Sequence, residues 1–141
     1  MTQRRLQDLP REACFTLLSQ EVVGRLVYVD DLGPVAIPVN YALDAETVVF
    51  RIEAGSKARA LQGPVAFEVD QIDHAEKAGW SVLLRGTCHE LDIELVPALL
   101  KRITDHFPRP WAAGQHNCWV SLVPGSVTGR QLAAPFFAPV F

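Results

Sequence analysis

The chain has 141 residues, 49% of them apolar, which is the size and composition of one folded domain with its own core. Its 13 basic and 16 acidic side chains leave a formal charge of −3, so we expect no nucleic-acid partner. Polar residues follow Met1–Arg5 and no segment has the length of a bilayer span, which predicts a cytoplasmic location and no membrane partner.

The cysteines and histidines form no pattern typical of a disulfide framework or a metal site. The three cysteines are widely spaced with no CxxC pair, so we expect reduced, mostly buried thiols at Cys14, Cys88 and Cys118. The histidines include no i, i+4 pair and no HExxH motif, and lie at His74, His89, His106 and His116. We therefore predict no metal ligands.

The first predicted elements are a helix and a three-stranded meander. Pro10 and the apolar stripe around it predict a helix within the N-terminal segment 1–21, ending near Gln20. Asp30–Gly33 has the composition of a turn. Period-two alternation predicts strands at residues 25–29, 35–41 and 47–52.

The second half predicts further strands and two helices. The expected elements in chain order are a helix at 55–62, a strand at 65–70, a polar excursion at 71–78, a strand at 80–91 with Gly86 as a bulge, a helix at 95–103, and strands at 118–123 and 126–132 around a Pro124–Gly125 turn. Six to seven strands with peripheral helices predict a mainly β protein, a small barrel, in one domain over residues 1–141.

The segment 133–141 is an apolar tail, with three phenylalanines and two prolines in nine residues. Such a segment is costly to leave in water. We therefore expect the tail to pack on a partner subunit.

Arg51 and the stretch Gly55-Ser56-Lys57 predict an anion site between a strand end and a helix start. A lysine in the first turn of a helix lies against the positive end of the macrodipole, which is unfavourable unless an anion lies between them. The Arg51 guanidinium and the Ser56 hydroxyl add donors that suit a phosphomonoester. The alternative is that Ser56 only caps the helix and Lys57 is a solvated surface charge.

An ordered set of short motifs surrounds this cluster. The motifs are Gly24-Arg25-Leu26, Pro38-Val39-Asn40-Tyr41, Val49-Phe50-Arg51, Gly55-Ser56-Lys57, Ala66-Phe67-Glu68-Val69-Asp70 and Gly79-Trp80-Ser81-Val82. The set resembles the pyridoxamine 5'-phosphate oxidase-like FMN-binding split barrels, from about Val22 to about Leu132. The resemblance implies a split β-barrel that forms a homodimer with FMN at the subunit interface.

The resemblance also implies which residues contact the cofactor. It implies that Arg51, Ser56 and Lys57 contact the phosphate. Val39 and Asn40 would offer backbone groups to the edge of the isoalloxazine ring, and Trp80 and Ser81 would border the ring. The second subunit would contribute Trp111, Trp119 and Arg130. No catalytic residue is implied, because the flavin itself carries the redox chemistry.

The implied activity is that of an FMN-dependent oxidoreductase acting on an unidentified small substrate. The parent oxidase is longer and has a C-terminal Arg-x-His motif, whereas Arg130 is here followed by Gln131-Leu132 and the apolar tail. We therefore do not expect vitamin B6 synthesis.

The alternative is a non-catalytic module that binds, stores or senses F420 or heme, as some relatives of this fold do. The anionic tail of F420 would need further cations, for which Arg25 and Arg59 are the candidates. Heme would need an axial ligand, for which His116 and Tyr41 are the candidates. His116 is also a candidate proton donor near the ring.

Overall fold

The computed structural model describes residues 5–53, 61, 63–103 and 117–133. Its elements are β1 (Arg5–Asp8), α1 (Arg11–Leu18), β2 (Val23–Asp30), β3 (Gly33–Asp44), β4 (Thr47–Glu53), β5 (Pro64–Asp73), β6 (Ala78–Glu90), the 3-10 helix η1 (Ile93–Leu95), α3 (Val96–Arg102) and β7 (Asn117–Ala133). The predicted helix at 55–62 lies outside the described residues except for Leu61.

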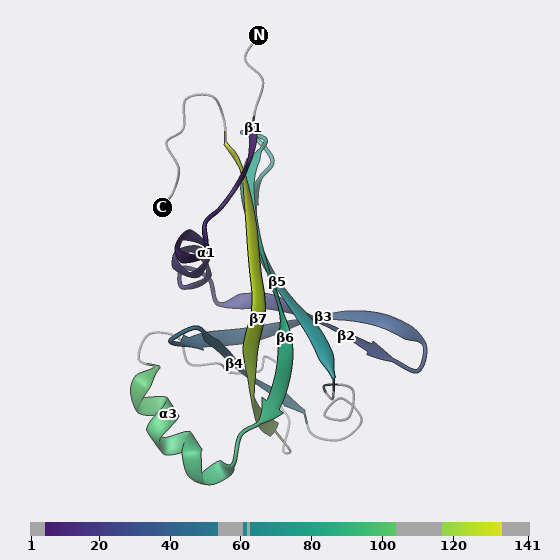
Figure 1. The fold of residues 1–141 in the computed structure, drawn as a ribbon, viewed down its shortest axis with the longest axis vertical. Coiled ribbons are helices and arrows are strands. Elements are labelled where there is room, and N and C mark those ends of the chain that lie inside the picture. Colours follow the sequence, from purple (N-terminus) through teal and green to yellow (C-terminus); the bar gives the residue numbers. More distant parts are fainter. Residues whose placement is uncertain (1–4, 54–60, 62, 104–116, 134–141) are drawn as a thin grey trace.

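The described strands form one seven-stranded antiparallel sheet in the order β1-β7-β4-β3-β2-β5-β6, and β6 also pairs with β7 (Figure 1). This last pairing closes six strands into a ring, and β1 extends the sheet outside the ring along one end of β7. Closure removes most open strand edges. The predicted mainly β split barrel with peripheral helices is therefore confirmed.

β7 is one continuous strand of 17 residues, so the prediction of two strands, 118–123 and 126–132, with a turn at Pro124–Gly125 is wrong. The β6–β7 register shifts between Arg85 and Gly86, so the irregularity expected at Gly86 lies at this position. An extra residue in one strand of a pair is a bulge, which bends the sheet as barrel closure requires.

Pro124 is tolerated inside β7 because, among the described strands, this part of β7 has a ladder on one side only, with β6. The β4 ladder along β7 ends at Leu122, and the β1 ladder begins at Arg130. Proline, which has no N–H to donate, is found in sheets at such edge positions and at bulges, and Pro124 lies at both.

Two other boundaries differ from the predictions. β1 lies within the segment 1–21, which was predicted as helical only, and all four of its side chains are exposed. Half of the predicted polar excursion 71–78 is strand, because β5 continues to Asp73 and β6 begins at Ala78.

The main core fills the ring of strands and is closed at one end by α1. Leu26, Phe50 and Phe67 are fully removed from solvent inside the ring, and Leu17 and Leu18 of α1 pack against them. Each such side chain contributes about 1.5–3 kcal/mol relative to an exposed one. Gly24 faces Phe67 so closely that a side chain at residue 24 would clash with the ring.

A second, smaller core lies under α3, on the outer side of the barrel. Leu99 and Ile103 pack there on Ala42 of β3 and Val49 of β4. Pro97 lies in the first turn of α3, where the missing N–H of proline costs nothing. The helix predicted at 95–103 is confirmed.

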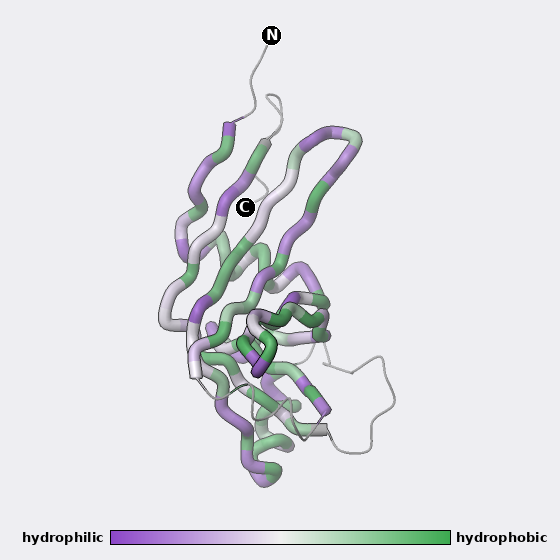
Figure 2. The backbone as a smooth tube through the Cα atoms, turned by 90° about the vertical axis from the view of Figure 1, so that its right-hand side faces the viewer, coloured by the Kyte–Doolittle hydropathy of each residue, from purple (hydrophilic) through white to green (hydrophobic). Residues whose placement is uncertain are grey.

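The long strands β5, β6 and β7 continue beyond the ring as an extension that β1 completes (Figure 1). The turn between β5 and β6 at its far end is coloured mostly hydrophilic in Figure 2. Among the described helices, none has the length and apolar character needed to cross a membrane.

Candidate cofactor site

Arg51 lies near the end of β4 on the side that faces α3. Alternation along β4 sends Phe50 and Ile52 into the main core and leaves Val49 and Arg51 on the outer face. The register places Arg51 directly opposite Trp119 of β7. Its guanidinium carbon lies 5.1 Å from the centroid of the indole ring, a cation–π contact worth about 0.5–1 kcal/mol when partly solvated.

The Nε atom of Arg51 is removed from solvent, and no hydrogen-bond acceptor in the described part of the chain contacts it. A buried donor left unsatisfied costs about 1–3 kcal/mol, and more when it is charged. A bound anion would supply the acceptor, because a guanidinium presents its N–H groups as a fork that matches two phosphate oxygens. The arrangement therefore fits the phosphate of a nucleotide cofactor.

The second core holds Trp119 in place. Its carbonyl accepts a hydrogen bond of 2.8 Å from the N–H of Leu91, and its side chain packs with Leu91 and Leu100 against this core. The partner of Arg51 is therefore fixed from the α3 side of the sheet.

Val39 and Asn40 lie on β3, the strand next to β4, and both are half-buried. The β3–β4 ladder ends at the pair of Tyr41 with Phe50, the residue before Arg51. Asn40 immediately precedes Tyr41 and so lies just beyond this end of the ladder. Val39 and Asn40 therefore lie at the same end of the barrel as the Arg51–Trp119 contact.

The other predicted cofactor contacts that the structure describes, Trp80, Ser81 and Arg130, all line one groove on the strand extension. The groove has a volume of about 320 Å³ and is lined by Leu6, Ile72, Lys77, Ala78, Gly79, Trp80, Ser81, Arg130 and Leu132. Register partners place Leu6, Leu132, Gly79 and Ile72 in one row across β1, β7, β6 and β5. We call this set the apolar row.

The apolar row carries exposed hydrophobic surface beside a polar row. Leu6 and Ile72 are 59% and 56% exposed, and the side chain of Ile72 lies so close to Gly79 that a Cβ there would be 3.0 Å from the Ile72 Cδ1 atom. Two register positions further along, on the same face, Ser81 pairs with Arg130, so a hydroxyl and a cation border the apolar surface.

Trp80 and its register partner Gln131 lie on the core side of the extension. Trp80 is 7% exposed and belongs to the main core, although it also lines the groove. The Oε1 atom of Gln131 is buried with no hydrogen-bond donor among the described residues. The sequence prediction did not include Gln131, because a single glutamine on a strand carries no motif.

The structure does not bring the predicted residues together within one chain. Trp119 and Arg130 lie eleven positions apart on β7, which at about 3.4 Å per residue separates them by roughly 37 Å. Ser56, Lys57 and Trp111 lie outside the described residues. We call the Arg51–Trp119 pair the anion clamp. One subunit therefore has this pair near one end of β7 and the groove near the other.

Tyr41 is not suited to be a heme ligand. Its side chain is 1% exposed, its ring packs edge-on against Phe67, and its hydroxyl donates a hydrogen bond to the carbonyl of Leu18. Burial, aided by the charge of Glu21, raises the pKa of Tyr41, so the phenolate that iron prefers is disfavoured. His116, the other candidate, lies outside the described residues.

Arg25 is engaged by two carboxylates and so gives little support to an F420 groove. Its Nη1 atom lies 3.4 Å from Glu68 and 3.5 Å from Asp70. Burial raises the pKa of Glu68 to about 7, with further contributions from its hydrogen bond to Asp70 and the charge of Asp70, and with Arg25 opposing. Arg59 lies outside the described residues.

The cysteines are free thiols, as predicted, but the expectation that most of them are buried is wrong, because only Cys14 is buried and Cys88 and Cys118 are half-buried. Burial raises the pKa of Cys88 to about 12 and also raises the pKa values of Cys14 and Cys118. These thiols are therefore poor nucleophiles. Within the described ranges, no group of three or more potential ligands could hold a metal ion.

Comparison with known proteins agrees with this fold. A family model for pyridoxamine 5'-phosphate oxidase matches residues 10–131. The chain is 27% identical to the uncharacterized protein Rv0080 of Mycobacterium tuberculosis over 143 residues, covering 96% of this chain and 91% of that protein.

Two solved structures from Mycobacterium smegmatis have the same fold. The structure of an FAD binding protein is 30% identical, covers 90% of this chain and 100% of its own, and superposes with a TM-score of 0.74. The structure of an FAD and heme binding protein is 20% identical, covers 93% of this chain and 76% of its own, and has a TM-score of 0.72.

The closed ring of strands with its extension defines a split-barrel protein of the class that includes flavin- and heme-binding members. The chain belongs to the pyridoxamine 5'-phosphate oxidase family.

Proposed function

We propose that this chain binds a flavin nucleotide, with FMN as the simplest ligand, and uses it as an oxidoreductase on a small molecule. The observation that carries the proposal is the buried, unpartnered Nε of Arg51 against Trp119, which fits a phosphate. Ser56 and Lys57 follow Arg51 within six positions and would add donors to the same phosphate. FAD has a phosphate in the same place, and the M. smegmatis relative is an FAD binding protein.

We further propose a homodimer in which each flavin contacts both subunits. In one chain the anion clamp and the groove lie roughly 37 Å apart along β7. A two-fold axis can place the clamp of one subunit beside the groove of the other, because an isologous interface repeats every contact. The exposed apolar row and the apolar tail 133–141 support this assembly, since both would leave water on association.

In this arrangement the protein holds and orients the ring system. Val39 and Asn40 would offer backbone groups to one edge of the ring, and Trp80, Ser81 and Arg130 would border it from the groove. The bound flavin supplies the hydride or electron transfer. Because Gln131-Leu132 replaces the Arg-x-His motif, we propose a substrate other than a phosphorylated B6 vitamer.

The second candidate function is binding or storage of another cofactor of this fold class. The FAD and heme binding protein of M. smegmatis favours keeping heme among the ligands to be tested. Because the side chain of Tyr41 is buried in the core, the axial ligand of a bound heme would have to be His116.

Titration of the purified chain with FMN, FAD, F420 and heme, followed by absorbance and flavin fluorescence, tests the proposal. We expect saturable binding of FMN or FAD. Arg51→Ala would remove most of that affinity, because it deletes the fork that meets the phosphate. Preference for F420 or heme, or no binding of any of the four, would contradict the flavin proposal.

A further inference from the structure

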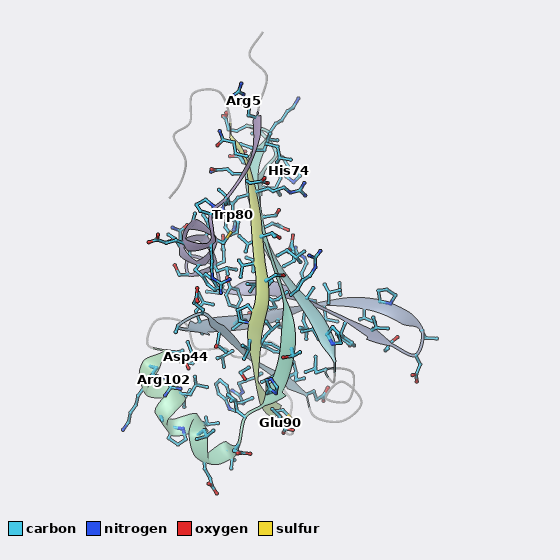
Figure 3. All side chains as sticks on the ribbon, in the orientation of Figure 1. Arg5, Asp44, His74, Trp80, Glu90 and Arg102 are labelled. Carbon is cyan, nitrogen blue, oxygen red and sulfur yellow. The ribbon has the colours of Figure 1, made fainter. Side chains whose placement is uncertain are left out.

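The turn between β3 and β4 carries two carboxylates, and each one holds a different helix. Asp44 accepts two hydrogen bonds of 2.9 Å from Arg102, the last residue of α3. Two positions further on, Glu46 accepts bonds of 3.1 and 3.3 Å from Arg11, the first residue of α1. Figure 3 shows Asp44 and Arg102 beside one another at the end of α3.

The two ion pairs are alike in chemistry but secure helices of unequal support. α1 buries Ala13, Cys14, Leu17 and Leu18 in the main core, and Tyr41 bonds the carbonyl of Leu18. This helix has many holds besides Glu46.

α3 is seven residues long and buries only Val96 and Leu99, with Ile103 following its last turn. A helix this short is marginal without tertiary contacts. A cation near its C-terminus is favourable to the helix dipole, and Asp44 fixes that cation in a bidentate geometry. The Asp44–Arg102 pair therefore provides a larger share of the contacts that hold α3 than the Glu46–Arg11 pair provides for α1.

The surface that α3 covers leads directly to Arg51. Leu99 and Ile103 form one core with Val49, and Trp119 packs against the same core. The indole of Trp119 in turn holds the guanidinium of Arg51, with 5.1 Å from its central carbon to the ring centroid. A displacement of α3 would remove the backing of Trp119 and leave Arg51 less well oriented.

We propose that Asp44 and Arg102 are positioning residues for the anion clamp, acting through α3 and Trp119 on Arg51. The pair touches no ligand itself. It fixes the wall behind the indole, so that the guanidinium is held in place before the phosphate arrives. This inference rests on the proposed flavin site.

The test compares the two ion pairs of the same turn. Asp44→Asn and Arg102→Gln break the α3 pair, and Glu46→Gln and Arg11→Gln break the matched α1 pair. FMN affinity is measured by fluorescence titration, and hydrogen exchange with mass spectrometry follows the amides of 93–103.

We expect Asp44→Asn and Arg102→Gln each to weaken FMN binding about fivefold and to speed exchange in 93–103, because an exposed bidentate pair contributes modestly. The double variant should be no weaker than either single one, since all break the same contact. Glu46→Gln and Arg11→Gln should stay within about twofold of the unaltered chain.

Unchanged FMN affinity in Asp44→Asn, or an equal loss in Glu46→Gln, would overturn the inference while leaving the flavin site intact. No FMN binding by the unaltered chain would overturn the proposed function first, and this inference with it. The two failures are therefore distinguishable.

Discussion

The two ends of β7 differ in the kind of surface that they present. At the barrel end, Arg51 keeps a buried donor unsatisfied and rests on Trp119, with a helix behind it. At the extension end, Arg130 is exposed and borders the apolar row, of which Leu6 and Ile72 remain more than half exposed. Among the described residues, the first end has a donor without an acceptor, and the second end has exposed apolar side chains.

In the homodimer that we propose, this difference means that a single chain holds two incomplete halves of a site. An unsatisfied donor and an exposed apolar surface each raise the free energy of the isolated subunit. A ligand at one end and a neighbouring subunit at the other would relieve both. The following predictions separate the two ends.

The largest effect should come from removing the charge at the barrel end. Arg51→Ala should weaken FMN binding about 100-fold, or about 2.7 kcal/mol, because the phosphate loses a bidentate charged donor. Fluorescence titration measures this. Arg85→Ala, at an exposed position on β6, is the control and should change little. A loss below about tenfold, about 1.4 kcal/mol, would place the phosphate elsewhere.

The stability of the barrel should depend on Gly24, because the core leaves no room for a side chain at this residue. A Cβ at this residue would overlap the ring of Phe67, which packs against Tyr41 and Phe50. Gly24→Ala should therefore lower the free energy of unfolding by about 2 kcal/mol, as measured by urea denaturation. Gly125→Ala is the matched control, because its Cβ would lie 3.5 Å from the nearest atom. Equal stability of the two variants would show that the core around Phe67 can shift.

At the extension end, removal of residues 134–141 should weaken dimerisation about tenfold, because the tail is apolar throughout. Sedimentation velocity over a range of concentrations measures the dissociation constant. Leu32→Asn is a control that removes an exposed apolar side chain, 99% exposed, from the β2–β3 turn instead. An unchanged dimer after truncation would assign the tail another role.

The smallest effect should be a pH dependence of stability from Glu68, whose neighbour Asp70 pairs with Ser81 of the groove. Its pKa is raised from 4.5 to about 7, so between these values the folded chain keeps a proton that the unfolded chain has lost. Stability therefore falls as pH rises through this window and is level above about 7.

The side chain of Glu68 is 30% exposed, so solvent screening should limit the change to about 1 kcal/mol. Urea denaturation at pH 5, 6, 7 and 8 measures it. Glu68→Gln should remove the slope, and Asp31→Asn, at an exposed turn, should preserve it. A slope that survives in Glu68→Gln would assign the proton to another group.

Much of the barrel could be predicted because its strands obey local rules. Alternation marked the core residues of β4 and β5, and the turn at Gly33 has the positive φ of 123° that favours glycine. β1 could not be predicted, because a short strand with four exposed side chains has no apolar face to reveal it. The turn predicted at Pro124–Gly125 was wrong because this pair is a strong turn signal. Whether a strand can contain the proline depends on its neighbours, and the β4 ladder along β7 ends before this position, at Leu122.

The site was predictable only where its residues are close in sequence. Arg51 was found from its place at the end of an apolar strand. Its contact with Trp119 depends on a register that joins residues 68 positions apart, and the pairing of Asp44 with Arg102 joins residues 58 apart. Tyr41 was considered as a ligand because its motif places it near the ring, whereas its burial is a property of the closed barrel.

The position of β7 in the chain has a consequence for how the protein folds. β7 pairs with β1, β4 and β6, so the ring cannot close until the last of the described strands has been synthesised. Until then β4 and β6 present unpaired edges, and their partners are far away in sequence, which slows pairing and favours association between chains. The topology therefore favours slow folding, with the closing of the ring as its last step.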